Sequence, residues 1–329
     1  MEYRRLGKTD MAVSAVALGC WAFAGGRVWG AQDEADSVAT VNAALDAGVN
    51  FFDTAEGYGA GHSELVLGRA LEGRRHEAVI ATKVSRSNLS GDEVQQACER
   101  SLQRLRTDYI DLYQVHWPSR TVPLVETLEI MEKLRGQGKV RAVGVCNFGA
   151  KDLSDLLVSG WVETNQLPYS LLWRAVEYQI RPKCVDKGIG ILCYSPLAQG
   201  LLTGKFSSPD EVPGGRARTR LFSTARPQAR HGEAGCEAEV FATLDKIGRI
   251  CDEIQRPMAE VALAWLLHQP GVTSVIAGAR QPDQIRQTVR AAELKLSPEI
   301  VGQLNKATDE LKRMLGSNPD MWQSESRFR

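Results

Sequence analysis

The sequence predicts an α/β protein: a (β/α)8 TIM barrel with an N-terminal β-hairpin and a long loop after the seventh strand. Eight short apolar runs alternate with segments whose apolar residues recur at helical spacing. The runs are nearly continuous, as the strands of a parallel sheet covered on both faces require. Eight such units in about 290 residues match a barrel. A doubly wound sheet is the alternative, but the glycines after Trp21 lack the G-x-G-x-x-G spacing of a dinucleotide-binding turn.

The predicted elements follow one another in a regular order. Residues 3–18 form a small hairpin, because residues 6–10 combine glycine with polar turn residues. The first helix covers residues 34–47 and stops at Gly48. The strands are predicted at residues 16–21, 49–53, 78–84, 109–116, 140–147, 162–166, 189–194 and 272–277. The other helices are predicted at residues 63–71, 92–105, 122–135, 151–158, 176–187, a helical segment that ends at 268, 282–292 and 298–315.

Composition restricts the classes of function. Forty basic residues balance forty acidic ones, which argues against nucleic acid as the main partner. The N-terminal segment lacks the apolar core of a signal peptide, and no run is long enough to span a bilayer. The seven cysteines form no C-x-x-C pair, and no Cys/His cluster has the spacing of metal ligands. We therefore expect a cytoplasmic protein with buried, reduced thiols and no metal.

One stretch interrupts the alternation of strands and helices. Residues 199–235 are rich in glycine, proline, serine and arginine, and they are too many for an ordinary connection, so we expect a functional lid or a disordered loop. We predict a single barrel domain over residues 1–315. The polar tail, residues 316–329, is expected to be a frayed terminus. Docking to a partner and folding over the active site are the alternatives for this tail.

Polar residues end three consecutive predicted strands. Asp53 ends the second strand, Lys83 the third and His116 the fourth. Tyr58 lies on the glycine-rich loop just after the second strand. In a TIM barrel the C-terminal ends of the strands meet on one face, where the chemistry takes place. The pattern therefore predicts that the four side chains converge, and an acid and a lysine buried there are costly unless they pair.

These residue types suit proton transfer to a carbonyl group. Free tyrosine has a pKa of roughly 10, and a nearby ammonium is expected to lower the pKa of Tyr58. Asp53 would hold Lys83 in place, and Tyr58 would donate a proton to a carbonyl oxygen or accept one from an alcohol. His116 would hydrogen-bond the same oxygen. Because the site lacks a nucleophile–base pair and a metal, it indicates hydride transfer from a nicotinamide.

The segment 48–55, with Glu64 and Gly68 behind it, resembles the first signature of the aldo-keto reductase superfamily. The match extends from residue 6 to about residue 292, and it resembles bacterial members close to the potassium-channel β-subunit branch. The resemblance implies a (β/α)8 barrel and an NADP(H)-dependent oxidoreductase. It also implies the catalytic tetrad Asp53, Tyr58, Lys83 and His116.

The same resemblance implies a cofactor site. Residues 144–148 are similar to the segment that holds the nicotinamide carboxamide, with Cys146 where the family more often has serine. Tyr194 resembles the aromatic residue that stacks on the nicotinamide. The implied cofactor-binding residues are Cys20, Trp21, Asp53, Cys146, Asn147, Gln166, Tyr194, Ser195, Pro196, Leu197, Ala198, Gly200, Leu201, Lys205, Arg218, Gly278, Arg280 and Gln284.

Positive charge favours NADP(H) over NAD(H). Residues 276–284 resemble the adenosine site of the family, and a helix that opens near Pro282 would direct free N–H groups toward phosphate. Arg280 would bind a 2′-phosphate through a forked contact. Lys205 and Arg218 would add charge from the lid.

Three functions are compatible with these residues. The leading hypothesis is the reduction of small aldehydes or ketones, sugar-derived ones included, with the proton coming from Tyr58. The second is a redox-neutral sugar epimerase or isomerase with tightly bound NADP, which the long lid would suit. The third is a redox-sensing regulatory subunit. A homo-oligomer is compatible with each. The expected substrate pocket consists of Trp21, Trp29, Tyr58, His116 and Trp117.

Overall fold

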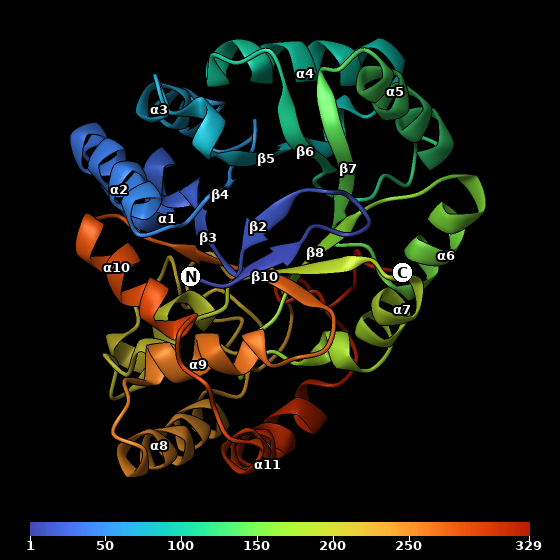
Figure 1. Ribbon diagram of the computed structural model, residues 1–329. Helices are drawn as coiled ribbons and strands as arrows, with labels where there is room; N and C mark the ends of the chain where they lie inside the picture. The colour runs from blue at the N-terminus through green and yellow to red at the C-terminus, as the bar shows by residue number, and fades with distance from the viewer.

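A computed structural model describes residues 1–329, with the side chain of Arg27 excepted. Eight parallel strands close into a barrel in the order β10-β3-β4-β5-β6-β7-β8-β9, and helices surround it (Figure 1). The predicted (β/α)8 barrel with its N-terminal hairpin and its long loop after the seventh strand is confirmed. The barrel strands are β3 (Val16–Gly19), β4 (Phe51–Asp53), β5 (Val79–Val84), β6 (Ile110–Val115), β7 (Val140–Cys146), β8 (Thr164–Pro168), β9 (Gly190–Tyr194) and β10 (Val272–Gly278).

Apart from the short α1, which was not predicted, the helices lie close to their predicted positions. They are α1 (Gly26–Trp29), α2 (Glu34–Asp46), α3 (His62–Ala70), α4 (Gly91–Leu105), α5 (Leu124–Gly136), α6 (Ala150–Ser159), α7 (Ile180–Lys187), α8 (Glu237–Glu253), α9 (Met258–Leu267), α10 (Pro282–Ala291) and α11 (Pro298–Leu315). The predicted helix 176–187 is divided into a 3-10 turn, Ala175–Glu177, and α7. The helical segment before His268 forms two helices, because Gln255 has a left-handed φ of 53° and Pro257 cannot continue a preceding helix. Among the described helices, none has the length and apolar character needed to cross a membrane.

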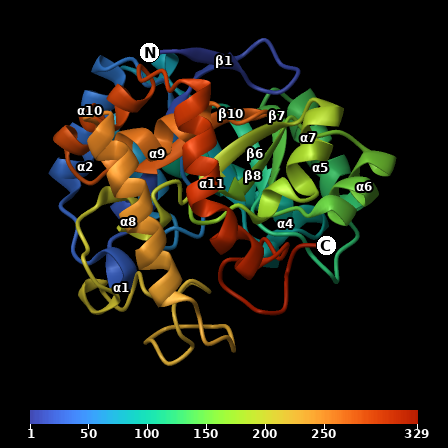
Figure 2. The same cartoon turned by 90° about the horizontal axis from the view of Figure 1, so that it is seen from below.

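The hairpin closes the N-terminal end of the barrel. Strand β1 (Tyr3–Arg5) pairs antiparallel with β2 (Ala12–Ser14). Leu6, Met11 and Val13 are buried from the hairpin side against interior barrel residues such as Phe51. Figure 2 shows β1 at one end of the molecule and the red C-terminal tail at the other. The hairpin therefore leaves only the C-terminal ends of the strands open to a ligand.

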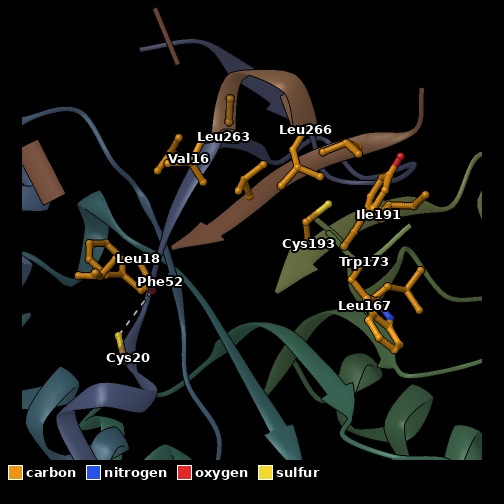
Figure 3. Packing of buried hydrophobic residues seen from close by; sticks show 14 of the residues in the cluster. Val16, Leu18, Cys20, Phe52, Leu167, Trp173, Ile191, Cys193, Leu263 and Leu266 are labelled. Atoms are coloured by element: carbon orange, nitrogen blue, oxygen red, sulfur yellow. Dashed lines mark hydrogen bonds between the residues drawn. The ribbon is translucent and has the colours of Figure 1, made fainter. Parts of the chain in front are cut away.

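A second apolar core fills the space between the barrel and its helices. Val16 of β3 lies against Leu263 of α9, and Leu18 lies beside Phe52 of the neighbouring strand (Figure 3). Burial of each such side chain contributes about 1.5–3 kcal/mol. The seven cysteines are all buried and unpaired, and several belong to this core.

The two-residue period of the strands separates apolar and polar layers inside the barrel. Phe51 of β4 and Ala81 of β5 belong to the apolar layer inside the barrel that packs against the hairpin. Asp53 and Lys83 lie two residues further along the same strands and face the same interior. The register of the two strands pairs Asp53 with Ala81. The barrel therefore presents its polar layer directly above a closed apolar floor.

The long connection between β9 and α8 is ordered and packed. It contains two 3-10 segments, η5 (Ala198–Thr203) and η6 (Pro209–Glu211), and it buries Leu221 and Phe222. Arg220 in this connection pairs with Glu233 at 2.8 Å between Nε and Oε1. Of the two predicted alternatives, a disordered loop is therefore wrong, and a structured lid is what the chain forms.

The C-terminal tail folds back onto the barrel. Asp320 is completely buried and accepts hydrogen bonds from Arg327 Nε at 2.6 Å and Nη2 at 2.8 Å. The indole nitrogen of Trp173 donates to the Pro319 carbonyl oxygen at 3.1 Å. Phe328 packs edge-on against Trp117, with ring centres 5.7 Å apart. The expected frayed terminus is wrong, because buried groups of the tail bind it to the barrel.

We predict that Asp320→Asn releases the tail. The substitution removes the charge that neutralises Arg327, and breaking a buried ion pair costs on the order of 3 kcal/mol. Hydrogen exchange at the backbone amides of residues 320–329 should become at least tenfold faster. The matched control is Glu325→Gln, which removes an exposed carboxylate from the same segment and should leave exchange unchanged. Equal exchange rates in the two variants would contradict this account of the tail.

Candidate active site

A buried lysine connects three of the four predicted tetrad residues. Lys83 Nζ donates to Asp53 Oδ1 at 2.7 Å, to the Thr54 carbonyl oxygen at 2.7 Å and to the Tyr58 hydroxyl at 3.3 Å. The side chain of Lys83 has no exposed surface. Its ammonium therefore uses its three donors on an acid, a backbone carbonyl and the phenol.

His116 lies on the other side of the phenol. The rings of Tyr58 and His116 are 5.7 Å apart between centres and nearly perpendicular, at 79°. The backbone N–H of His116 donates to the Val84 carbonyl oxygen, one residue beyond Lys83. The structure thus brings all four predicted residues together at the ends of β4, β5 and β6, and the loop after β4 supplies Tyr58.

Burial controls the protonation states of the site. Burial lowers the pKa of Lys83, but Asp53 and the other contacts raise it by more than burial lowers it. The pKa is therefore raised overall, and the ammonium stays charged. Burial raises the pKa of Tyr58 to about 12, although the Lys83 charge acts to lower it. The expected net lowering of the Tyr58 pKa is therefore wrong in the ligand-free protein, because desolvation outweighs the ammonium. Burial and then the Lys83 charge lower the pKa of His116 to about 3, so its imidazole is neutral.

Neighbouring strands hold the tetrad in place. Gln166 Nε2, from β8, donates to Asp53 Oδ2 at 2.7 Å, so both carboxylate oxygens are hydrogen-bonded. Glu64, which is buried on α3, accepts from the Thr82 hydroxyl at 2.6 Å and from Arg104 Nη1 at 3.0 Å. The second of these bonds ties α3 to α4, and the first fixes β5 beside Lys83.

Asn147 connects the tetrad with the next strand ends. Its amide nitrogen donates to the His116 carbonyl oxygen at 3.0 Å, and its amide oxygen accepts from the Tyr194 hydroxyl at 3.0 Å. Asn147 has a left-handed φ of 65°, a conformation that asparagine tolerates better than most residues. The side chain of Cys146 is buried inside the barrel, where its thiol contacts Gln114 Oε1 at 3.6 Å.

A cavity of about 990 Å³ lies over the tetrad. Most residues proposed from the sequence line it: Trp21, Trp29, Asp53, Tyr58, His116, Trp117, Asn147, Gln166, Tyr194, Ser195, Pro196, Leu197, Gly200, Lys205, Arg218, Gly278, Arg280 and Gln284. Lys83 lies beneath the cavity floor. The side chains of four proposed cofactor residues are buried behind the wall: Cys20, Cys146, Ala198 and Leu201.

The cavity walls carry cations without carboxylate partners. Among the described residues, no carboxylate forms an ion pair with the lining residues Lys205, Arg216, Arg218, Arg230, Arg280 and Arg290. Burial and then the Arg216 charge lower the pKa of Lys205, and burial and then the Arg280 charge lower the pKa of Arg216. Lys205 and Arg216 both lie beside Gly200. Arg218 is placed differently, over the rings of Trp21 and Trp322.

Sequence reasoning missed several cavity residues. Arg216, Arg230 and Arg290 belong to an arginine-rich lid or an amphipathic helix, where nothing in the pattern distinguishes them from solvated residues. Trp322, Gln323 and Arg327 come from the tail, which was expected to be frayed. The Met-Trp pair in an otherwise polar terminus is the one signal that could have identified the tail as part of the wall.

The residues present fit an anionic, nucleotide-like ligand. Two buried polar atoms of the wall, Trp29 Nε1 and Gln199 Oε1, have no hydrogen-bond partner among the described residues, and a bound ligand would supply one. The neighbouring cations Lys205, Arg216 and Arg280 suit phosphate groups. No group of three or more metal-binding side chains occurs in the part of the chain that the structure describes.

Comparison with known proteins identifies the family. The sequence model of the Aldo/keto reductase family matches residues 15–309. Aldo-keto reductase YhdN of Bacillus subtilis (strain 168) is 36% identical over 295 residues, which cover 87% of this chain and 87% of that protein. The NADH-specific methylglyoxal reductase of Escherichia coli (strain K12) is 34% identical over 331 residues, which cover 94% of this chain and 98% of that protein.

Solved structures agree with the sequence comparison. An aldo/keto reductase from Klebsiella pneumoniae, crystallised in complex with NADP and acetate, has a TM-score of 0.74 and 32% identity, and the match covers 93% of this chain and 95% of that one. Both the sequence and the barrel are thus shared along nearly the whole chain. The protein therefore belongs to the aldo/keto reductase family of oxidoreductases.

Proposed function

We propose that the protein is a cytoplasmic, NADP(H)-dependent reductase of small aldehydes and ketones, sugar-derived ones included, and that it runs reversibly toward the alcohols. The observation that carries this proposal is the hydrogen-bonded chain from Asp53 through Lys83 to the Tyr58 hydroxyl beneath one large cavity. A methylglyoxal reductase among the relatives supports the substrate class. We also propose that residues 1–315 form a single catalytic domain.

Tyr58 is the proposed proton donor. A substrate carbonyl oxygen that accepts from its hydroxyl would also lie near the neutral imidazole of His116, because the two rings adjoin. As negative charge develops on that oxygen, the Lys83 ammonium stabilises the phenolate that proton transfer leaves behind. Asp53 keeps Lys83 in position. The high pKa of Tyr58 in the ligand-free protein keeps the donor protonated at neutral pH.

The cofactor would occupy the strand ends from β7 to β10. A bound nicotinamide supplies the hydride that this chain lacks. Asn147 and Gln166 are the proposed carboxamide partners, and Tyr194 is the proposed stacking residue. Gln166 already donates one hydrogen to Asp53, so its second hydrogen and its carbonyl oxygen are the groups that would bind the carboxamide.

We propose a preference for NADP(H) over NAD(H). Arg280 contacts only neutral groups, the Gln32 amide oxygen at 2.6 Å and the Ala31 carbonyl oxygen, so its charge is open to a phosphate. Lys205 and Arg216 add charge nearby. The relatives differ on this point, since one is named NADH-specific and a structural neighbour was crystallised with NADP. The cluster of three cations is our reason for choosing NADP(H).

We predict that Tyr58→Phe lowers kcat for aldehyde reduction by about 10²–10⁴-fold, because proton donation in the transition state is lost. The Kd for NADPH, measured from cofactor fluorescence, should stay nearly constant. Tyr178→Phe, which removes the hydroxyl of an exposed tyrosine on the outer surface, is the matched control and should behave like the wild type. A Tyr58→Phe enzyme that keeps a tenth or more of kcat would refute the assigned proton donor.

The lowered pKa of His116 and the raised pKa of Tyr58 predict a flat pH profile. Reduction needs protonated Tyr58, which is lost only as pH rises through about 12, and His116 is already neutral above about 3. The kcat/KM for reduction should therefore not change between about pH 5.5 and 9.5, a range that includes the ordinary histidine pKa of about 6.5. Alcohol oxidation needs deprotonated Tyr58 and should rise about tenfold per pH unit. A break in the reduction profile near pH 6.5 would contradict the neutral state of His116.

We predict that Arg280→Gln raises the Kd for NADPH by about 10–100-fold and leaves the Kd for NADH nearly unchanged, because a charged hydrogen bond to the 2′-phosphate contributes about 1.5–3 kcal/mol. Fluorescence titration with each cofactor measures both constants. Arg286→Gln is the control, since Arg286 lies on α10, the helix that follows Arg280, and pairs with Asp283. Equal losses with both cofactors would show that Arg280 does not recognise the phosphate.

A further inference from the structure

Arg218 lies over two indole rings at the cavity wall. Its guanidinium carbon lies 5.8 Å from the ring centre of Trp21 and 4.5 Å from that of Trp322. Its Nε donates to the Gly215 carbonyl oxygen at 3.0 Å. These contacts fix the guanidinium and leave its terminal N–H groups without a partner among the described residues.

A second cation, Arg230, lines the same cavity and is exposed to solvent. Burial lowers the pKa of Arg218 first, and the charge of Arg230 lowers it further. Other arginines of the same lid are neutralised: Arg220 pairs with Glu233, and Arg226 pairs with Asp210 and Glu237. Arg220 and Arg226 thus have carboxylate partners, whereas Arg218 and Arg230 have none among the described residues. Arg218 is partly buried whereas Arg230 is exposed, so an anion bound beside Arg218 would compensate the less solvated of the two charges.

Arg218 lies near the proton donor. Trp21, which contacts Arg218, also stacks on Tyr58 with ring centres 5.8 Å apart and an angle of 28° between the planes. Of the cations proposed for the cofactor, Lys205 and Arg216 lie beside Gly200, and the guanidinium carbon of Arg216 lies 5.6 Å from the ring centre of Trp29. Arg218 is therefore the cation that contacts the ring stacked on Tyr58, namely Trp21.

We propose that Arg218 and Arg230 form an anion-binding subsite for the substrate, and that the preferred substrates are carbonyl compounds that carry a carboxylate or a phosphate. This inference rests on the proposed reductase function. A stacked guanidinium presents its remaining N–H groups in one plane, the geometry that a carboxylate or phosphate accepts in a forked contact. The tail contributes to this subsite, because Trp322 is one of the two indole rings next to Arg218.

Matched substrate pairs test the subsite in the full-length protein with NADPH. 4-Carboxybenzaldehyde is compared with 4-formylbenzamide, and glyceraldehyde 3-phosphate with glyceraldehyde, so the two arms separate carboxylate from phosphate recognition. In at least one pair the wild type should show roughly tenfold or higher kcat/KM for the anion, as a charged hydrogen bond would give. Arg218→Gln should abolish that preference through KM. Because the family resemblance implies a cofactor role for Arg218, the ratio of kcat/KM within each substrate pair is the readout, and the Kd for NADPH decides between the two roles.

Two further variants sharpen the comparison. Arg218→Lys keeps the charge but not the planar fork, and it should restore part of the preference. Arg226→Gln removes a paired arginine of the same lid outside the cavity and should preserve the full preference. Equal kcat/KM within both pairs for the wild type would overturn the proposal. An Arg218→Gln protein that binds NADPH at least tenfold more weakly would also overturn it, since Arg218 would then belong to the cofactor.

A binding measurement separates this inference from the reductase function. Trp21 and Trp322 flank Arg218, so an anion bound there should change tryptophan fluorescence in the NADP-loaded protein. Benzoate and inorganic phosphate are titrated against benzamide. If no aldehyde is reduced, the reductase function fails. In that case an anion-dependent signal that Arg218→Gln removes would still support the subsite, and no such signal would overturn it.

Discussion

The structure depends on a lysine ammonium placed where no water reaches it. Lys83 has no exposed surface, and burying an unpaired charge there would cost several kcal/mol. Asp53, the Thr54 carbonyl and Tyr58 satisfy its three donors, and Gln166 satisfies the second oxygen of Asp53. Removing any one partner would leave a buried polar group unsatisfied. This requirement fixes the ends of β4, β5 and β8 relative to one another, and it is the reason the proton donor has a defined position.

The barrel makes that arrangement possible by stacking layers. Side chains two residues apart on a strand face the same interior, so Phe51 and Ala81 form an apolar floor directly beneath Asp53 and Lys83. The hairpin closes the opposite end with Leu6 and its neighbours. Water and ligands therefore reach the polar layer only from the lid side. Burial, and not the neighbouring ammonium, then dominates the pKa of Tyr58.

The sequence predicted the site residues that end individual strands, but it did not predict the contacts between segments that are distant in the chain. Asp53, Lys83 and His116 could be placed because each ends an apolar run, and parallel strands bring such ends together. The tail could not be placed, because its docking depends on Trp173 bonding to Pro319 and on Asp152 accepting from the backbone N–H of Arg329. The Tyr58 pKa shift was predicted with the wrong sign, since a residue list shows the charge beside a phenol but not how completely the protein excludes water.

The distribution of charge shows what the cavity is built to hold. The chain as a whole carries equal numbers of acidic and basic residues, yet the wall gathers cations that no carboxylate among the described residues neutralises. Lid arginines that stabilise the fold, such as Arg220, have acidic partners. An uncompensated arginine in a partly buried wall is a cost to the ligand-free protein. Under the proposed anion binding, a bound carboxylate or phosphate would offset this cost for the partly buried Arg218, whereas the exposed Arg230 is already solvated.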